Sequence, residues 1–175
     1  LSGIVVIDRT EVILDIFVRV NSGGTRLDAA DLMFAAMKEE WSEVEERIED
    51  VVAKLNGEQL AFDKSFALKC LAVAYGKGAE LGPDKFDSED GRALLSKIEE
   101  EWPRAEATFE QLRDLIRNEL CLYSDRVVRS YGSFVPIFDF LFHNPKPDEA
   151  NRQLLRAYYY KSQLFNWYRA GTDKL

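Results

Sequence analysis

The sequence predicts a mainly α-helical domain, an irregular bundle of about seven helices with at most one short strand near the N-terminus. Apolar residues recur at every third or fourth position along most of the chain. Capping residues, glycines and prolines separate these periodic stretches. The chain has 175 residues, of which 46% are hydrophobic, so residues 1–175 can bury a hydrophobic core as a single domain.

The first elements follow from local patterns. Residues 2–7 include a β-branched run bounded by glycine and aspartate, and they form the one candidate strand. Residues 11–20 place their apolar side chains on one stripe of a helix. A second helix runs from residue 28 to about 41, with Asp28 as its N-cap. Ser42 is expected to cap a third helix over residues 43–55, whose acidic side chains form its solvated face.

The remaining helices are separated by glycines and prolines. Residues 62–75 are apolar on most sides, which is expected of a central helix. Residues 88–120 form two helices with a break near Trp102, because Pro103 fits a first helical turn and disfavours a helix interior. Residues 134–142 form a short buried helix. Asp148 caps the last helix, which is predicted to run towards Ala170. Because aromatic residues surround most of this helix, we expect both of its sides to be covered, one within this chain and the other by a part outside it.

Cysteine and histidine usage limits the chemistry. Cys70 and Cys121 both lie in apolar helical contexts, and we expect both to be buried small hydrophobic residues in a reducing compartment. His143 is the single histidine. One histidine and two cysteines far apart in the sequence do not make up a transition-metal site, so none is predicted. The sequence shows no signal peptide and no membrane-spanning segment, so a cytoplasmic location is expected.

Charge is unevenly distributed along the chain. The net charge is −8, yet the balance turns basic after about residue 120. Arg126, Arg129, Arg152 and Arg156 are therefore candidates for contact with DNA or an acidic partner. The alternative is that this basic surface is solvated and simply complements the acidic half of the chain.

A second candidate site lies at the junction between the helices predicted for residues 11–20 and 28–41. Its polar groups are the side chains of Arg19, Asn21 and Thr25, with the backbone amides of Gly23 and Gly24. Amides at a helix start together with an arginine can bind a nucleotide or phosphate group. The alternative is that Arg19 and Asn21 only stabilise the turn through nearby aspartates or carbonyls.

The same junction carries a family resemblance. Ile16-Phe-Val-Arg-Val-Asn-Ser-Gly-Gly-Thr-Arg-Leu27, followed by Ala30-Asp-Leu32, resembles a signature of the GmrSD-type restriction-endonuclease N-terminal family, catalogued as domain of unknown function 262. The family pattern is roughly Phe-x-Arg-x-Asn-x-x-Gly-x-x-Leu. Weaker similarity continues at residues 133–141 and 166–174, so the resemblance spans nearly all of the chain.

This resemblance implies a role within a larger protein. The family has an upstream part with a ParB/sulfiredoxin-like fold, whose Asp-Gly-Gln-Gln-Arg motif serves nucleotide hydrolysis, and some members cut modified DNA in defence against phage. The present sequence lacks that motif. We therefore expect the chain to be the C-terminal helical part of such a module, completing or supporting an upstream part that is absent. The parent protein would use an NTP and a divalent cation.

No independent catalysis is predicted for this chain. The lone histidine has no linked serine or cysteine motif, and the carboxylate pairs are adjacent residues that point apart on a helix. An alternative function is a helical interaction module without a catalytic role. Such a module would dock a protein or DNA through the basic, aromatic C-terminal helix.

Overall fold

The computed structural model describes residues 34, 37–57, 59–78 and 89–168, and these residues are mainly helical, as predicted. They contain six α-helices and no strand, compared with about seven helices expected for the whole chain. The strand predicted at residues 2–7 and the helix predicted at 11–20 lie outside the described residues. The helices are α3 (Val44–Asn56), α4 (Lys64–Ala74), α6 (Glu89–Glu100), α7 (Trp102–Asp114), α8 (Phe134–His143) and α9 (Glu149–Leu164).

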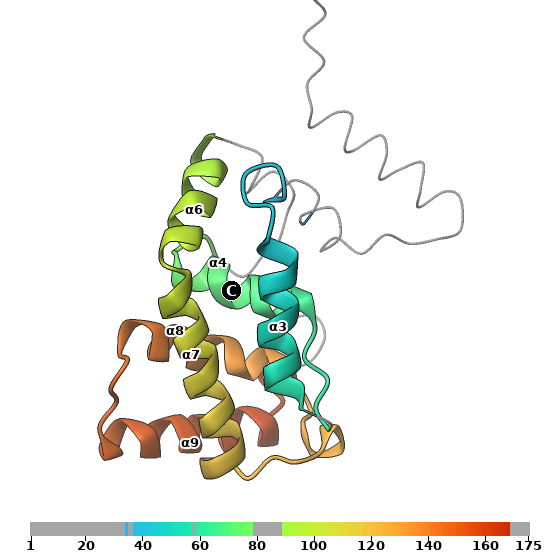
Figure 1. Cartoon of the computed structure of the whole chain (residues 1–175). Coiled ribbons are helices and arrows are strands. Elements are labelled where there is room, and N and C mark those ends of the chain that lie inside the picture. Colours follow the sequence, from blue (N-terminus) through green and yellow to red (C-terminus); the bar gives the residue numbers. More distant parts are fainter. Residues whose placement is uncertain (1–33, 35–36, 58, 79–88, 169–175) are drawn as a thin grey trace, which may run out of the picture.

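Four helices form the centre of the bundle. Helix α3 lies beside α7, and α4 and α8 pack against this pair and against each other (Figure 1). Helix α6 leads into α7 at one end of the molecule, and α9 lies across the opposite end (Figure 1). Because the apolar stripes of these helices all turn inward, a single continuous core runs through the bundle.

The most apolar helix occupies the most buried position. The side chains of Ala67, Cys70 and Ala72 on α4 are fully buried, which confirms the prediction that this helix is central. Towards α9 the core becomes aromatic, because Phe134 packs against Phe62 and stacks on Tyr159 with ring centroids 4.9 Å apart. This aromatic cluster joins α9 to the rest of the bundle.

The helix boundaries test the predicted caps. Asp148 is confirmed as a cap, because it accepts a hydrogen bond from the Asn151 amide at 2.8 Å. Asp63, which was not predicted as a cap, accepts a hydrogen bond from the Phe66 amide at 2.7 Å and caps α4. Pro103 lies in the first turn of α7 and separates it from α6, as expected. The predicted Ser42 cap is wrong. Glu43 holds that position, and its carboxylate binds Arg47 at 3.0 Å instead of a backbone amide.

Three other predictions are corrected by the fold. Helix α7 continues into a π-helical turn, η1 (Leu115–Glu119), which the sequence pattern did not indicate. Cys121, expected to be buried, is exposed and adopts φ 53° just after this turn, whereas Cys70 is buried as predicted. Helix α9 ends at Leu164 and not near Ala170, since Asn166 adopts a left-handed φ of 52° that terminates a helix.

The connection between η1 and α8 contains two short 3₁₀ turns, η2 (Asp125–Val127) and η3 (Tyr131–Ser133). The Tyr131 hydroxyl donates to Asp125 at 2.6 Å and accepts from the Ala61 amide at 2.8 Å, which fastens this connection to the segment before α4. Within the described part of the chain, every helix is too short or too polar to cross a bilayer.

Candidate functional site

The two predicted groups of site residues have different outcomes. Arg19, Asn21, Gly23, Gly24 and Thr25 lie outside the described residues, so a phosphate site at that junction stays a prediction. The second group, Arg126, Arg129, Arg152 and Arg156, is described. Only two of these four arginines share a contact.

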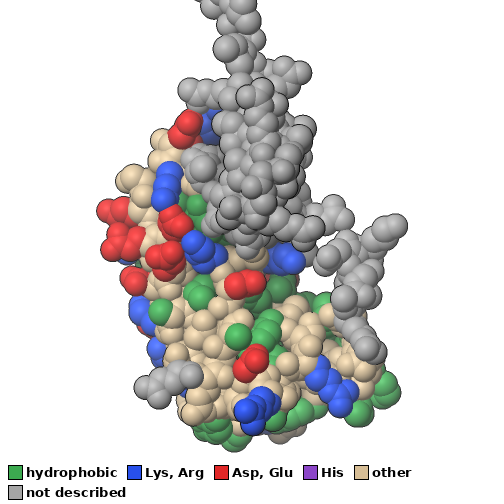
Figure 2. Space-filling model, turned by 90° about the vertical axis from the view of Figure 1, so that its right-hand side faces the viewer, with side chains coloured by type: hydrophobic (Ala, Val, Ile, Leu, Met, Phe, Trp, Pro, Cys, Tyr) green, Lys and Arg blue, Asp and Glu red, His purple; other side chains and the backbone are tan. Residues whose placement is uncertain are grey.

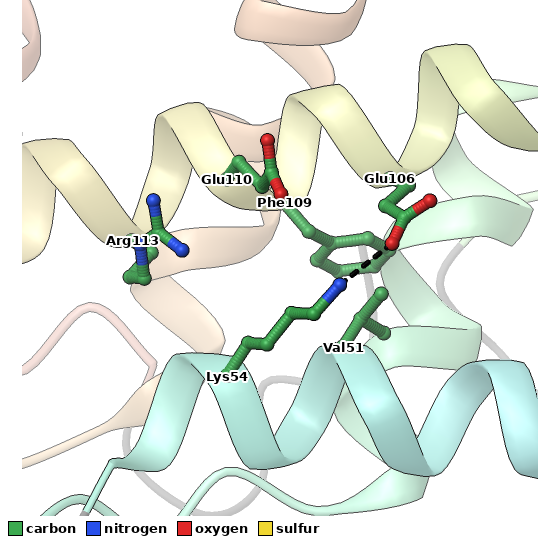
Figure 3. A pocket seen from close by; sticks show the side chains of 6 residues that line it. All are labelled: Val51, Lys54, Glu106, Phe109, Glu110 and Arg113. Carbon is green, nitrogen blue, oxygen red and sulfur yellow. Dashed lines mark hydrogen bonds and ion pairs between the residues drawn. The ribbon is translucent and has the colours of Figure 1, made fainter.

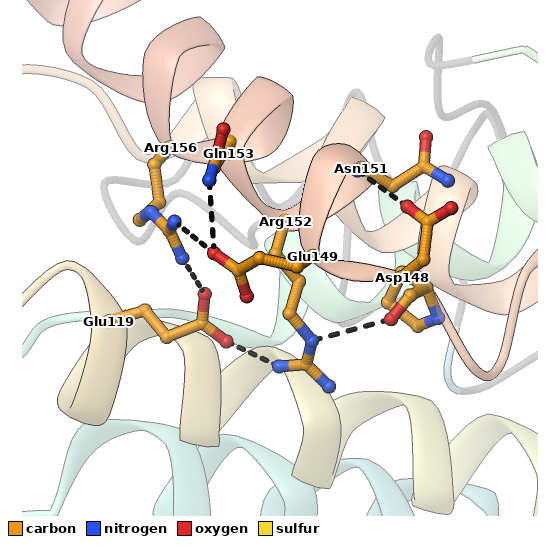
Figure 4. Close-up of polar contacts among 8 residues, drawn as sticks. Glu119, Asp148, Glu149, Asn151, Arg152, Gln153 and Arg156 are labelled. Carbon is orange, nitrogen blue, oxygen red and sulfur yellow. Dashed lines mark hydrogen bonds and ion pairs between the residues drawn. The ribbon is translucent and has the colours of Figure 1, made fainter.

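Arg152 and Arg156 meet at one carboxylate, that of Glu119 on η1. Arg152 Nη1 lies 2.5 Å from Glu119 Oε1, and Arg156 Nη1 lies 2.7 Å from Glu119 Oε2 (Figure 4). Arg156 also donates from Nη2 to Glu149 at 2.7 Å. Two arginines and two glutamates therefore form a connected network that joins α9 to the end of α7.

This network neutralises the arginines within the chain itself. The hydrogen bond from Arg156 lowers the pKa of Glu149, and Glu149 and Glu119 together raise the pKa of Arg156. Glu119 belongs to the acidic half of the sequence and the two arginines to the basic half. At these positions the basic segment complements the acidic segment, which was one of the two alternatives for its role.

The π-helical turn decides where the Glu119 carboxylate lies. The Leu120 amide donates to the Leu115 carbonyl at 2.9 Å, a bond spanning five residues that widens the last turn of the helix. The Glu119 side chain is only 16% exposed, which places its carboxylate against α9. No periodic pattern in the sequence marks such a turn, so the partner of the two arginines was missed.

Arg126 and Arg129 lie on the connection before α8. Arg126 makes no ion pair within the described residues, and its side chain is exposed. Arg129 donates from Nη1 to the Gln163 carbonyl at 3.4 Å. Beside Arg129 is an open hollow of about 360 Å³, lined by Arg129, Ser130, Ser162, Gln163 and Asn166.

The polar groups below this hollow are already bonded to each other. The Gln163 Oε1 accepts from the amides of Arg129 and Ser130, at 2.7 and 3.3 Å. Its Nε2 donates to the Ser130 carbonyl at 3.0 Å and to the Ser133 hydroxyl at 2.6 Å. Gln163 thus fastens α9 to the connection before α8, and its four hydrogen bonds leave it no free polar group to offer a ligand.

A second recess, between α3 and α7, is closed. Val51, Lys54, Glu106, Phe109, Glu110 and Arg113 surround it, and it contains no volume that a water molecule can occupy (Figure 3). Lys54 binds Glu106 across it at 2.7 Å, and this hydrogen bond raises the pKa of Lys54. The recess is an inter-helical ion pair over apolar side chains and not a ligand pocket.

The most unusual surface is the solvent side of α9 and the turn that follows it. Large apolar side chains are exposed there, with Leu154 67%, Leu164 66% and Phe165 63% accessible. Figure 2 shows hydrophobic side chains along the lower edge of the molecule, the height at which α9 lies in Figure 1. Within the described residues only one side of α9 packs on the core, and the other side, which was expected to pack against a part outside this chain, is exposed. We call this surface the outer face of α9.

An exposed apolar face of this kind is typical of a surface that binds another protein segment. Within the described residues no three histidine, cysteine or acidic side chains are grouped to hold a metal ion. The outer face of α9 is thus the best candidate for a functional surface. Neither the models of known protein families nor the curated protein sequences match this chain.

Proposed function

We propose that this chain is the helical part of a GmrSD-like defence protein that hydrolyses a nucleotide and targets DNA. Its role would be to complete or support the catalytic module and not to catalyse a reaction alone. The observation that carries this proposal is the match of residues 16–27 to the family signature, in which Arg19, Asn21 and Gly24 occupy the characteristic positions.

The outer face of α9 gives the proposal a physical basis. A supporting domain must contact the module that it supports, and such contacts use apolar surface that would otherwise face water. Helix α9 has that surface in addition to the side that already packs on the core, where Leu155 and Tyr159 are buried. The nucleotide and its divalent cation would bind the parent protein, with Arg19 and Asn21 contributing to the phosphate site.

Nucleotide hydrolysis by the full-length parent protein tests this function. We expect Arg19→Ala and Asn21→Ala each to lower kcat/KM by at least about tenfold, because a charged or bidentate contact to phosphate is lost. Arg26→Ala is the matched control, since Arg26 lies within the signature at a position that the family pattern leaves open and is not part of the proposed site. The present chain alone should show no turnover. Unchanged hydrolysis in both variants would refute the proposed role of the junction.

A second candidate function is an interaction module that docks a separate protein and has no link to catalysis. The exposed outer face of α9 favours a protein over DNA as the partner, because Arg152 and Arg156 are neutralised by Glu119 and Glu149. DNA binding would be recognised by an affinity that falls steeply with salt concentration. Loss of such binding in Arg126→Glu and Arg129→Glu would assign it to the connection before α8.

A further inference from the structure

Helix α9 buries fewer apolar side chains than any other α-helix in the described part of the chain. Among its 16 residues only Leu155 and Tyr159 are both apolar and buried. The shorter helices α4 and α8 bury seven and six apolar side chains. Because burial of apolar surface supplies most of the free energy that holds a helix in place, α9 is the helix that the core holds least strongly.

One of these two side chains is only partly satisfied by its surroundings. The Tyr159 ring stacks on Phe134 with centroids 4.9 Å apart, but its hydroxyl is buried and has no hydrogen-bond partner among the described residues. A hydroxyl that loses water and gains no partner costs free energy, which offsets part of what burial of the ring contributes. This cost disappears when α9 leaves the bundle and the hydroxyl meets water.

Polar contacts supply the rest of the attachment. In the first half of α9, Arg152 and Arg156 bind Glu119 at 2.5 and 2.7 Å. Near its end, Gln163 bonds to the connection before α8. The two arginine side chains are 44% and 28% exposed, so salt in the solvent can screen their ion pairs. The attachment of α9 therefore depends on salt in a way that apolar packing at the bundle centre does not.

The chain before α9 allows this helix to move while α8 stays in place. The Asn144 amide and side chain both donate to the Phe140 carbonyl, at 2.8 and 2.9 Å, which closes the end of α8 with contacts of its own. Residues 144–146 that follow are exposed, and Pro145 and Pro147 cannot continue the helix. A movement of α9 about this connection therefore leaves the end of α8 intact.

We propose that α9 is a detachable strap, which opens as a unit from a bundle that stays folded, and that the Glu119 ion pairs make its opening sensitive to salt. A helix of 16 residues is only marginally stable alone, so α9 unfolds as it detaches. Its opening uncovers the face of Phe134 on which Tyr159 stacks and thus exposes apolar surface of α8. The strap is independent of the proposed function, whose site is centred on Arg19.

Amide hydrogen exchange in the 175-residue chain, resolved by peptide mass spectrometry in mild urea, tests the proposal. A hydrogen-bonded amide exchanges only when its segment opens, so the rates report which helices open together. We expect the amides of α9 to exchange at one common rate, at least about tenfold faster than those of α4. High salt should accelerate exchange in α9 more than in α4.

Two substitutions separate detachment of α9 from unfolding of the whole protein. Ile48 is fully buried on α3, where its contacts persist while α9 is open, so Ile48→Val should accelerate α4 about fivefold and leave α9 unchanged. Glu119→Gln weakens contacts that the opening breaks. It should accelerate α9 about tenfold and reduce the effect of salt, whereas Glu99→Gln, at an exposed position, should do neither.

Three results would overturn the proposal. Exchange in α9 no faster than in α4, or equal acceleration of both helices by Ile48→Val, would mean that α9 opens only when the whole protein unfolds. Rates that fall steadily from one end of α9 towards its middle would indicate fraying and not detachment. An α9 rate that Glu119→Gln leaves unchanged would refute the control by ion pairs. Circular dichroism verifies that each variant is folded.

Discussion

Replacing Gln163 by alanine should destabilise the protein more than any other single polar-to-alanine change near α9. The Gln163 side chain is 9% exposed and makes four hydrogen bonds to residues 129–133. Its removal leaves the Arg129 and Ser130 amides without their acceptor, whereas the Ser130 carbonyl and the Ser133 hydroxyl each lose one donor but stay bonded to each other at 2.8 Å. The attachment of α9 to the connection before α8 would be weakened.

The size of the effect follows from these groups. A buried polar group left unpaired costs about 1–3 kcal/mol, so the two amides together would cost about 2–6 kcal/mol if both stayed dry. The neighbouring hollow of about 360 Å³ is open, so water can enter and bond to some of them. We therefore expect a loss of about 2–3 kcal/mol in the free energy of unfolding. For a domain of this length that corresponds to a fall in Tm of about 4–12 °C.

Urea unfolding followed by circular dichroism measures this loss, with the slope of the transition verifying that both proteins unfold in the same way. Gln153→Ala is the matched control on the same helix. Gln153 is exposed and has one side-chain contact, to Glu149 at 3.5 Å, so its variant should stay within about 0.5 kcal/mol of the original protein. If the two variants lose equal stability, the Gln163 network does not fasten α9 as described.

Three further predictions test the electrostatics and the thiols. Glu119→Gln should lower the free energy of unfolding by about 1–2 kcal/mol, and by less at high salt, because it weakens the ion pairs with Arg152 and Arg156. Glu99→Gln, at an exposed position, is the control and should cost little. Equal losses of stability in the two variants at all salt concentrations would contradict the network. A thiol reagent should modify Cys121 in the folded protein but Cys70 only after unfolding, since Cys121 is exposed and burial raises the pKa of the Cys70 thiol well above its ordinary value. Cys121→Ser should abolish the reaction of the folded protein with the reagent. Burial and the hydrogen bond to Asp125 raise the pKa of Tyr131 from 10.0 to about 12. The stability that the protonated Tyr131 hydroxyl contributes is therefore complete below about pH 10 and is lost as the pH rises towards 12. Tyr131→Phe should remove this pH dependence, and an alkaline unfolding profile that the substitution leaves unchanged would refute the prediction.

The helices of the centre were predictable because their signals are local. The buried stripe of α3, with Val44, Ile48, Val51 and Leu55, can be read from spacing alone. Asp63 and Asp148 cap helices within three residues of themselves, and Pro103 separates α6 from α7 through its own ring. Each of these effects depends on residues that are neighbours in the chain.

Predictions failed where a residue had several possible partners. The exposure of Cys121 and the position of Glu119 both depend on the π-helical turn η1, which a periodic pattern does not reveal. Ser42 was a plausible cap, but the helix begins one residue later. The end of α9 was placed too late because aromatic residues continue past Leu164, although the left-handed Asn166 stops the helix.

The candidate sites show the same difference between local sequence signals and contacts made by distant segments. The sequence alone determined that the C-terminal segment is basic and aromatic, and it contains the signature around Arg19 and Asn21 whose function stays a proposal. Only the tertiary structure decided that Arg152 and Arg156 bind Glu119, which precedes them by 33 and 37 residues. It also decided which side of α9 faces water. Composition and periodicity are properties of the chain, whereas ion pairing and exposure depend on which distant segments meet, and that is set by the packing of the core.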